Sequence, residues 1–455
     1  MDSRSKNNLH VVETDWDEIE KKIRAHRVRR MRRIAIIVGV CVAAFIGYYV
    51  YMQHKTYDEY TVTEEISRSD SSAAKYLAYD SGYLKYSNDG ASYVSMDNTL
   101  LWNQSYEMAD PMVSICDSYV AVADRDGETI YVMNEDGLQC EITVNMPISR
   151  VEVASQGTVA VLMEESGTGY LSLFDTNGDQ IAEGAIHVEN SGIPMDIALS
   201  TNGKNLAVSI VDVSSGSAGT TIQFYNFGTT GQNQIDNLVG SFTYADTVMP
   251  DLVYVDDSTL LAFADQGVYT FSGASSPQES AALAVDDEIM SIFYDDSYFG
   301  LVYSDASRDS GRVIKVYDTS CKEQVTIETE FSYDSIGFLD NHEICLLNSG
   351  QCSIFTLGGL EKFTYAFEEE IIAVFHDRGF RKYVILKEDI TECVRLNLIK
   401  GSTETETEAE ADMDTETETE TNTNTETGAE TGTDTGGETD TDTGEETDTE
   451  AEDEI

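Results

Sequence analysis

A short apolar run that recurs about every 40 residues is the feature that most constrains this fold. Seven such runs of four residues begin 39, 47, 54, 39, 45 and 39 residues apart, at Val120, Val159, Leu206, Leu260, Phe299, Ile344 and Tyr383. Shorter apolar stretches and turns rich in Asp, Asn, Gly or Ser surround each run, a pattern typical of short β-strands. A period near 40 residues with four short strands per unit predicts an all-β fold, the β-propeller. Small residues within the runs, such as Ala160 and Gly300, suit close packing between blades.

Counting the expected strands predicts eight blades, with seven as a close alternative. Six units lie between about residues 111 and 369, three strands follow in 371–398, and four precede in 76–106. If Tyr60–Ile66 closes the last blade, the total is 32 strands and eight blades. If Tyr76–Asp80 merges with the strand after it, seven blades result. In both cases the ring closes by joining strands from the two ends of the domain.

An uncharged apolar segment precedes the repeats. Ile34–Met52 is 19 residues long and would span about 28 Å as a helix, close to the ~30 Å hydrocarbon core of a bilayer. A signal peptide has a shorter apolar region and ends at a small-residue cleavage site. This segment instead ends in Tyr48, Tyr49 and Tyr51, which suit a membrane interface. We therefore expect a retained transmembrane helix that contacts membrane lipid.

The charges beside the segment predict its orientation. Lys21–Arg33 holds eight Lys or Arg and no acid, whereas only Lys55 follows closely. Positive residues stay inside, so we expect a cytoplasmic N-terminus, an extracellular C-terminal domain, and binding of anionic lipid by the basic cluster. Thr14 resembles a helix cap, and Trp16, Ile19 and Ile23 form a short apolar stripe. This stripe either extends the helix along the interface or docks a cytoplasmic partner.

The C-terminal region has the opposite composition. Residues 401–455 contain 22 Asp or Glu and no Lys or Arg, and 18 Thr alternate with them. With almost nothing apolar to bury, this region should be disordered, as a solvating spacer, a weak cation binder or a glycosylated tail. The net charge of −55 argues against nucleic-acid binding. The expected divisions are a cytoplasmic tail 1–33, a membrane helix 34–52, a linker with a possible closing strand 53–73, a propeller 74–400 and a tail 401–455.

No catalytic, cofactor-binding or metal-binding residue is predicted. Three of the six histidines, His187, His342 and His376, lie in the repeats, on different units and without metal-ligand spacing. No nucleophile motif is present. The segments 124–128 and 175–179 resemble calcium loops but lack a complete ligand set, so ordinary Asp-rich turns are favoured. The acidic residues at 256–257, 286–288 and 295–296 are interpreted in the same way.

Cysteines, tyrosines and one insertion leave further alternatives open. The seven Cys are odd in number and favour free thiols over a disulfide framework. In a two-residue hairpin Cys345 faces Ile354 and Cys352 faces Leu347, so these two cysteines should not pair.

The 25 Tyr either pack between blades, which we favour, or bind sugars or protein loops on an exposed face. The Ser- and Gly-rich insertion Val213–Thr221 predicts a long flexible loop.

Several short stretches together resemble a known family. They are 82–90 (GYLKYSNDG), 101–103 (LWN), 191–200 (SGIPMDIALS), 202–204 (NGK) and 224–227 (FYNF). In this order they are similar to a domain-of-unknown-function family of membrane-anchored propeller proteins of Gram-positive bacteria, over about residues 34–400. The resemblance implies a WD40-like propeller at the cell surface and implies no activity.

The sequence therefore favours a non-catalytic binding or scaffold module for an extracellular protein or glycan. Two alternatives remain. A surface enzyme acting on polysaccharide would need paired carboxylates near the central channel. A signalling receptor would use the cytoplasmic tail.

Overall fold

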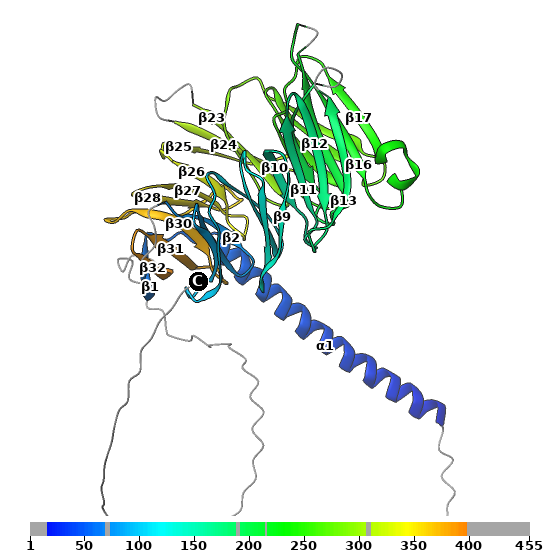
Figure 1. The fold of residues 1–455 in the computed structure, drawn as a ribbon. Helices are drawn as coiled ribbons and strands as arrows, with labels where there is room; N and C mark the ends of the chain where they lie inside the picture. The colour runs from blue at the N-terminus through cyan, green and yellow to red at the C-terminus, as the bar shows by residue number, and fades with distance from the viewer. Residues whose placement is uncertain (1–15, 69–72, 188–191, 214–215, 306–310, 398–455) are drawn as a thin grey trace, which may run out of the picture. The chain divides into compact units, whose positions relative to one another are not determined.

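The computed structural model describes residues 16–68, 73–187, 192–213, 216–305 and 311–397 (Figure 1). The chain divides into two units, Met1–Gly401 and Ser402–Ile455. Within the described residues, one long helix, α1 (Trp16–Gln53), precedes 32 strands and two short 3-10 helices, η1 (Gly231–Asn233) and η2 (Ile235–Asn237). The expected tail 401–455 lies outside the described residues.

The strands form eight four-stranded antiparallel sheets, which are the blades of a propeller. Blade 1 consists of β2 (Lys75–Tyr79), β3 (Gly82–Ser87), β4 (Gly90–Ser95) and β5 (Leu100–Ser105), and blade 2 of β6 (Pro111–Cys116), β7 (Tyr119–Asp124), β8 (Thr129–Asn134) and β9 (Gly137–Thr143). Blade 3 consists of β10 (Ile148–Val153), β11 (Val159–Glu165), β12 (Thr168–Phe174) and β13 (Gln180–His187). Blade 4 consists of β14 (Ile193–Leu199), β15 (Asn205–Asp212), β16 (Gly219–Asn226) and β17 (Leu238–Tyr244).

Blades 5 to 8 continue in the same order, with the last strand of blade 8 taken from the N-terminal side. Blade 5 consists of β18 (Asp251–Tyr254), β19 (Thr259–Ala264), β20 (Gly267–Ser272) and β21 (Gln278–Ala284), and blade 6 of β22 (Ile289–Tyr294), β23 (Tyr298–Ser304), β24 (Arg312–Asp318) and β25 (Glu323–Thr329). Blade 7 consists of β26 (Ser335–Phe338), β27 (Ile344–Asn348), β28 (Gln351–Phe355) and β29 (Glu361–Ala366). Blade 8 consists of β30 (Ile371–His376), β31 (Lys382–Lys387), β32 (Ile390–Asn397) and β1 (Glu59–Ser67). First strands of neighbouring blades contact one another, as β10 does with β6 and β14, so they line the central channel.

The ring closes through β1, which confirms the eight-blade prediction. β1 pairs antiparallel with β32 from Glu59↔Asn397 to Ser67↔Ile390, and in Figure 1 the blue β1 lies beside the orange β32. The Tyr57 N–H also donates to the Lys362 carbonyl at 2.7 Å. The seven-blade alternative is wrong, because β2 is a separate strand that turns at Asp80 and pairs with β3.

The recurring apolar runs lie in the second strand of each of blades 2 to 8 and form the core. Val120, Val161 and Leu206 have no exposed surface. These strands are covered on both faces by neighbouring blades, which explains why they are almost continuously apolar rather than alternating. Gly300 shows how close the packing is, because a Cβ atom there would lie 2.1 Å from the Phe293 ring.

Helix α1 is longer than the expected span 34–52. It begins at Trp16, continues through the basic segment 21–33, and contains an apolar stretch, Arg30–Met52, that is long enough to cross a membrane. The proposed cap Thr14 lies outside the described residues. The structure corrects the expected loop Val213–Thr221, since Gly219–Thr221 belong to β16 and pair with β15.

The hairpin register at the two neighbouring cysteines agrees with the sequence prediction. Cys345 lies opposite Ile354 and Cys352 opposite Leu347. Both thiols are free and buried, yet their Sγ atoms lie 3.8 Å apart as diagonal neighbours. Of the tyrosines, Tyr79, Tyr83, Tyr93 and Tyr383 are buried between blades, as the packing interpretation predicted.

Candidate functional site at the mouth of the channel

The turns that join the first and second strands of the blades lie together at one end of the channel. We call these the AB turns and this end the AB face. In antiparallel blades the turns between third and fourth strands open on the same side. β1 begins beside Asn397, at the end of β32, so the chain enters the propeller from α1 on the AB face.

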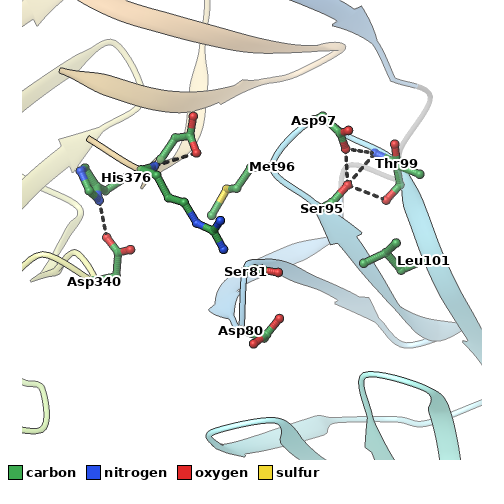
Figure 2. A pocket seen from close by; sticks show the side chains of 11 residues that line it. Asp80, Ser81, Ser95, Met96, Asp97, Thr99, Leu101, Asp340 and His376 are labelled. Carbon is green, nitrogen blue, oxygen red and sulfur yellow. Dashed lines mark hydrogen bonds and ion pairs between the residues drawn. The ribbon is translucent and has the colours of Figure 1, made fainter. Parts of the chain in front are cut away.

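A cavity of about 660 Å³ lies on the AB face where blades 7, 8 and 1 meet (Figure 2). We call it the mouth cavity. It is lined by Asp80, Ser81, Ser95, Met96, Asp97, Thr99, Leu101, Asp340, His376, Asp377 and Arg378. A further cavity of about 320 Å³, lined by β2, β26 and β30, shares Asp80, Asp340 and His376 with it. The mouth cavity therefore opens into the channel.

His376 connects blades 7 and 8 at this mouth. Its Nδ1 lies 2.7 Å from an Asp340 carboxylate oxygen, and its Nε2 lies 2.6 Å from the Gly379 carbonyl oxygen. Burial opposes the charged imidazole, but the contacts with Asp340 and Gly379 outweigh it and raise the pKa of His376. Both ring nitrogens face acceptors, so the geometry favours the doubly protonated ring and leaves no lone pair for a general base.

Two carboxylates on the blade 1 side are also held by the protein. Asp80 accepts a hydrogen bond from the Tyr93 hydroxyl at 2.7 Å, and this bond, together with the charge of Arg378, lowers the pKa of Asp80. Hydrogen bonds from Ser95 and Thr99 lower the pKa of Asp97. The mouth cavity is thus a polar site with fixed anions and one guanidinium, suited to recognising charged or hydrogen-bonding groups.

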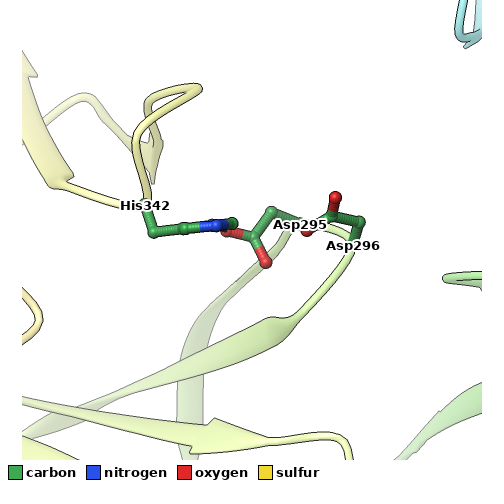
Figure 3. A group of neighbouring side chains, drawn as sticks. All are labelled: Asp295, Asp296 and His342. Carbon is green, nitrogen blue, oxygen red and sulfur yellow. Dashed lines mark hydrogen bonds and ion pairs between the residues drawn. The ribbon is translucent and has the colours of Figure 1, made fainter. Parts of the chain in front are cut away.

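Blades 6 and 7 carry a second histidine–carboxylate contact on the AB face (Figure 3). His342 Nδ1 lies 2.6 Å from Asp295 Oδ2, and ligand atoms of Asp295, Asp296 and His342 all lie within 4.8 Å of one another. Among the described residues, this is the group whose side chains could hold a metal ion. The second Asp295 oxygen accepts the backbone N–H groups of Ser297 and Tyr298, as expected of a tight turn.

Inside the channel, blades 3, 4 and 5 contribute a set of carboxylates. Glu152, Asp196 and Asp251 come from three neighbouring first strands, and Arg150 contacts Asp196 at 3.2 Å. Burial, and then the nearby Asp196, raises the pKa of Glu152 to about 8. Burial also raises the pKa of Asp196 to about 7, against the hydrogen bond from the Leu252 N–H. Near neutral pH, Glu152 is therefore mostly protonated and Asp196 partly protonated.

The acidic turns singled out from the sequence are distributed around the ring rather than gathered. Asp124 Oδ1 accepts the N–H groups of Ala109 and Asp110, and Asp175 Oδ1 accepts those of Asn177 and Asp179. Both carboxylates thus brace backbone turns, as the turn interpretation predicts.

Sequence reasoning missed the residues that meet at the mouth and in the channel. One signal was available. Asp340 precedes His376 by 36 residues and Asp295 precedes His342 by 47, close to one repeat, so each pair occupies matching turns of consecutive units. Two of the channel carboxylates gave another signal, since Asp196 and Asp251 are acids in or at the start of otherwise apolar first strands.

Comparison with solved structures finds propellers. The chain is similar to BamB from Moraxella catarrhalis, at 14% identity and a TM-score of 0.42, covering 74% of this chain and 100% of that one. It is also similar to the C-terminal WD40 domain of Sif2, at 11% identity and a TM-score of 0.49, covering 75% and 99%. None of these similarities bears on function. Among curated proteins, no sequence matches the chain. A family model of unknown function matches residues 53–396, which spans the whole propeller from the end of α1, and the chain therefore belongs to that family, DUF5711.

Proposed function

We propose that this protein is a membrane-anchored propeller at the cell surface that binds an extracellular protein or glycan without transforming it. The observation that carries the proposal is the direct connection of a membrane-length helix to a propeller with a polar cavity at its channel mouth. The eight basic residues of 21–33 favour a cytoplasmic N-terminus. The engaged nitrogens of His376 favour recognition over proton transfer.

Anchoring and orientation are tested first, with the full chain carrying one epitope at each end. The proposal expects the protein to stay in the membrane fraction after alkaline carbonate extraction. Protease added to intact cells should remove the C-terminal epitope and spare the N-terminal one. Release by carbonate would contradict the anchor, and the reverse digestion pattern would contradict the orientation.

Binding at the mouth is tested by photo-crosslinking in cells. A photoreactive residue replaces Asp97 at the mouth cavity, and a matched control replaces Asp89, which lies in the turn between β3 and β4 at the other end of blade 1. A discrete adduct from position 97 alone would support a partner at the mouth. Adducts of the same kind from both positions, or from neither, would contradict it.

The channel carboxylates favour one second candidate, an enzyme acting on polysaccharide. Such enzymes use two carboxyl groups, one protonated and one ionised, and burial raises the pKa of Glu152 to about 8 and that of Asp196 to about 7. Against this, Glu152 is held by the Ser114 hydroxyl at 3.0 Å and Asp196 by Arg150. Release of reducing ends from cell-surface polysaccharide by the purified chain, lost in Glu152→Gln, would favour the enzyme over the binding module.

A further inference from the structure

We propose that the AB turn of blade 8, residues 377–381, together with Lys382, contacts the surface of an anionic lipid bilayer beside the end of α1. We call this segment the contact loop. The inference rests on the proposed anchoring of α1 and adds a second point of attachment between the propeller and the membrane.

The end of α1 lies against the contact loop. Met52, the last residue of the candidate span, is only 7% exposed, and it lines a cavity of about 300 Å³ together with Gly379 and Phe380. The preceding residues Tyr48 and Tyr51 are exposed, as expected of aromatic side chains at the depth of the lipid headgroups. Because Phe380 lines the same cavity as Met52, it lies near the same depth.

The contact loop differs in composition from the other seven AB turns. It reads Asp-Arg-Gly-Phe-Arg and is followed by Lys382, so it has two arginines and a large apolar residue at its tip. Four other AB turns carry acids without any Lys or Arg, at 80–81, 117–118, 255–258 and 295–297. The turn 339–343 has two acids and His342, 154–158 is uncharged, and 200–204 has only Lys204. The contact loop with Lys382 thus holds more Lys and Arg residues than any other AB turn, and it is the turn beside α1.

The side chains of this loop suit a membrane surface. Phe380 is 37% exposed, and Lys382 is exposed beside it. An aromatic group flanked by basic residues places its ring among the headgroups while the cations meet lipid phosphates. Each basic residue near an anionic surface strengthens the contact. Arg378 lines the mouth cavity instead, so Arg381 and Lys382 provide the contact, with Lys55 beside Tyr51 adding to it. The acidic side chains of Asp377, Asp58 and Glu59 oppose this contact with the anionic bilayer.

Depth-dependent quenching tests the contact in the full chain, reconstituted in vesicles that contain brominated phosphatidylcholine. In a Trp16→Phe background, Phe380→Trp reports the contact loop, and Trp102 is common to all variants. The matched control is Glu388→Trp, in the exposed turn at the other end of blade 8. We expect quenching at position 380 to exceed that at 388 at least about twofold, and to increase when phosphatidylglycerol is added.

A charge test completes the experiment. Arg381→Gln with Lys382→Gln should remove most of the phosphatidylglycerol-dependent quenching at position 380. The control, Lys204→Gln with Lys322→Gln, changes two exposed lysines in turns of blades 4 and 6 and should leave the quenching unchanged. Equal quenching at positions 380 and 388 would overturn the proposed contact. Quenching at position 380 that changes neither with phosphatidylglycerol nor with the loss of the two basic side chains would overturn it as well.

The anchor is monitored separately by Tyr51→Trp. If position 51 is quenched and position 380 is not, the contact loop is wrong and the anchor stands. If neither position is quenched, the anchoring of α1 itself is wrong.

Discussion

At the scale of single residues, the channel contains carboxyl groups that are costly to ionise. Glu152 accepts a hydrogen bond from Ser114, and Asp196, Asp251 and Arg150 are its charged neighbours. One guanidinium cannot neutralise three carboxylates, and burial penalises the charge of each. The raised pKa values of Glu152 and Asp196 make the stability of the protein depend on pH.

Glu152→Gln should change that dependence. Because the folded protein holds a proton on Glu152 up to about pH 8 and the unfolded chain loses it near pH 4.5, stability falls as pH rises between these values. The variant should match the parent near pH 5 and be more stable at pH 9, by on the order of 1–2 kcal/mol after allowance for its coupling to Asp196. Urea unfolding at the two pH values measures this. The exposed control Glu288→Gln should leave the profile unchanged, and an equal effect of Glu152→Gln at both pH values would contradict the assignment.

Gly300→Ala should destabilise the protein by about 1–3 kcal/mol, because the new methyl group overlaps the buried Phe293 ring, which itself packs on Phe338. The matched control is Gly184→Ala, where a Cβ meets nothing within 4 Å. Thermal unfolding of both variants measures the difference. Equal midpoints would show that blade 6 relaxes around the methyl group without cost.

At the scale of elements, the ring is joined by β1, a strand contributed from the far end of the domain sequence. Its Tyr60 packs against Phe363, Tyr365 and Phe367 of blade 7, with ring centroids 6.4, 5.0 and 5.8 Å away. β1 thus holds blade 8 by backbone pairing and blade 7 by side-chain packing. Without β1, blade 8 would have three strands and β32 would be its unpaired edge.

Tyr60→Ala should open this closure before the rest of the ring. The loss of a partly buried aromatic side chain costs about 2–4 kcal/mol, and we expect it to appear as faster hydrogen exchange in β1 and β32. Exchange in β15 of blade 4 serves as the internal control and should not change. Uniformly faster exchange in all blades would instead indicate that the ring unfolds as one cooperative unit.

At the scale of the whole molecule, the inner wall of the ring has two different sides. Blades 3 to 5 contribute the carboxylates, whereas blades 6, 8 and 1 contribute the exposed apolar side chains Met290, Ile292, Ile372 and Leu77. The mouth cavity and the entry of α1 both lie at blades 7, 8 and 1. The cavity proposed to bind a partner and the helix proposed to cross the membrane thus both lie near the blades at which the ring closes.

A chain that ends at Gly401 should unfold at the same temperature as the full chain, within about 2 °C, because residues 402–455 have almost nothing apolar to contribute to the core. Scanning calorimetry of both chains measures this. A chain that ends at Asp389 is the contrast, since it lacks β32 and should lose the closure. A large shift on removing 402–455 alone would show that this region contacts the propeller.

The sequence by itself determined the blade period, because the period depends on local apolar periodicity and on the spacing of the runs. It favoured eight blades over seven and offered Tyr60–Ile66 as a possible closing strand, and strand pairing then decided both. The buried second strands, such as the one containing Val161, were recognisable because both of their faces are covered. The length of α1 and the end of the loop at Thr221 were less well predicted, since helix extension and strand pairing continue beyond the apolar residues that signal them.

Only the tertiary structure decided which polar residues meet. Asp340 and His376, or Glu152 and Asp196, belong to different repeats, and no local pattern states that their side chains share a turn or a channel wall. The ring brings matching positions of successive blades together, and the low polarity of its interior then sets their protonation. The propeller architecture was therefore predictable from the sequence. The side-chain contacts and protonation states at the mouth and in the channel depend instead on how the blades are arranged around one axis.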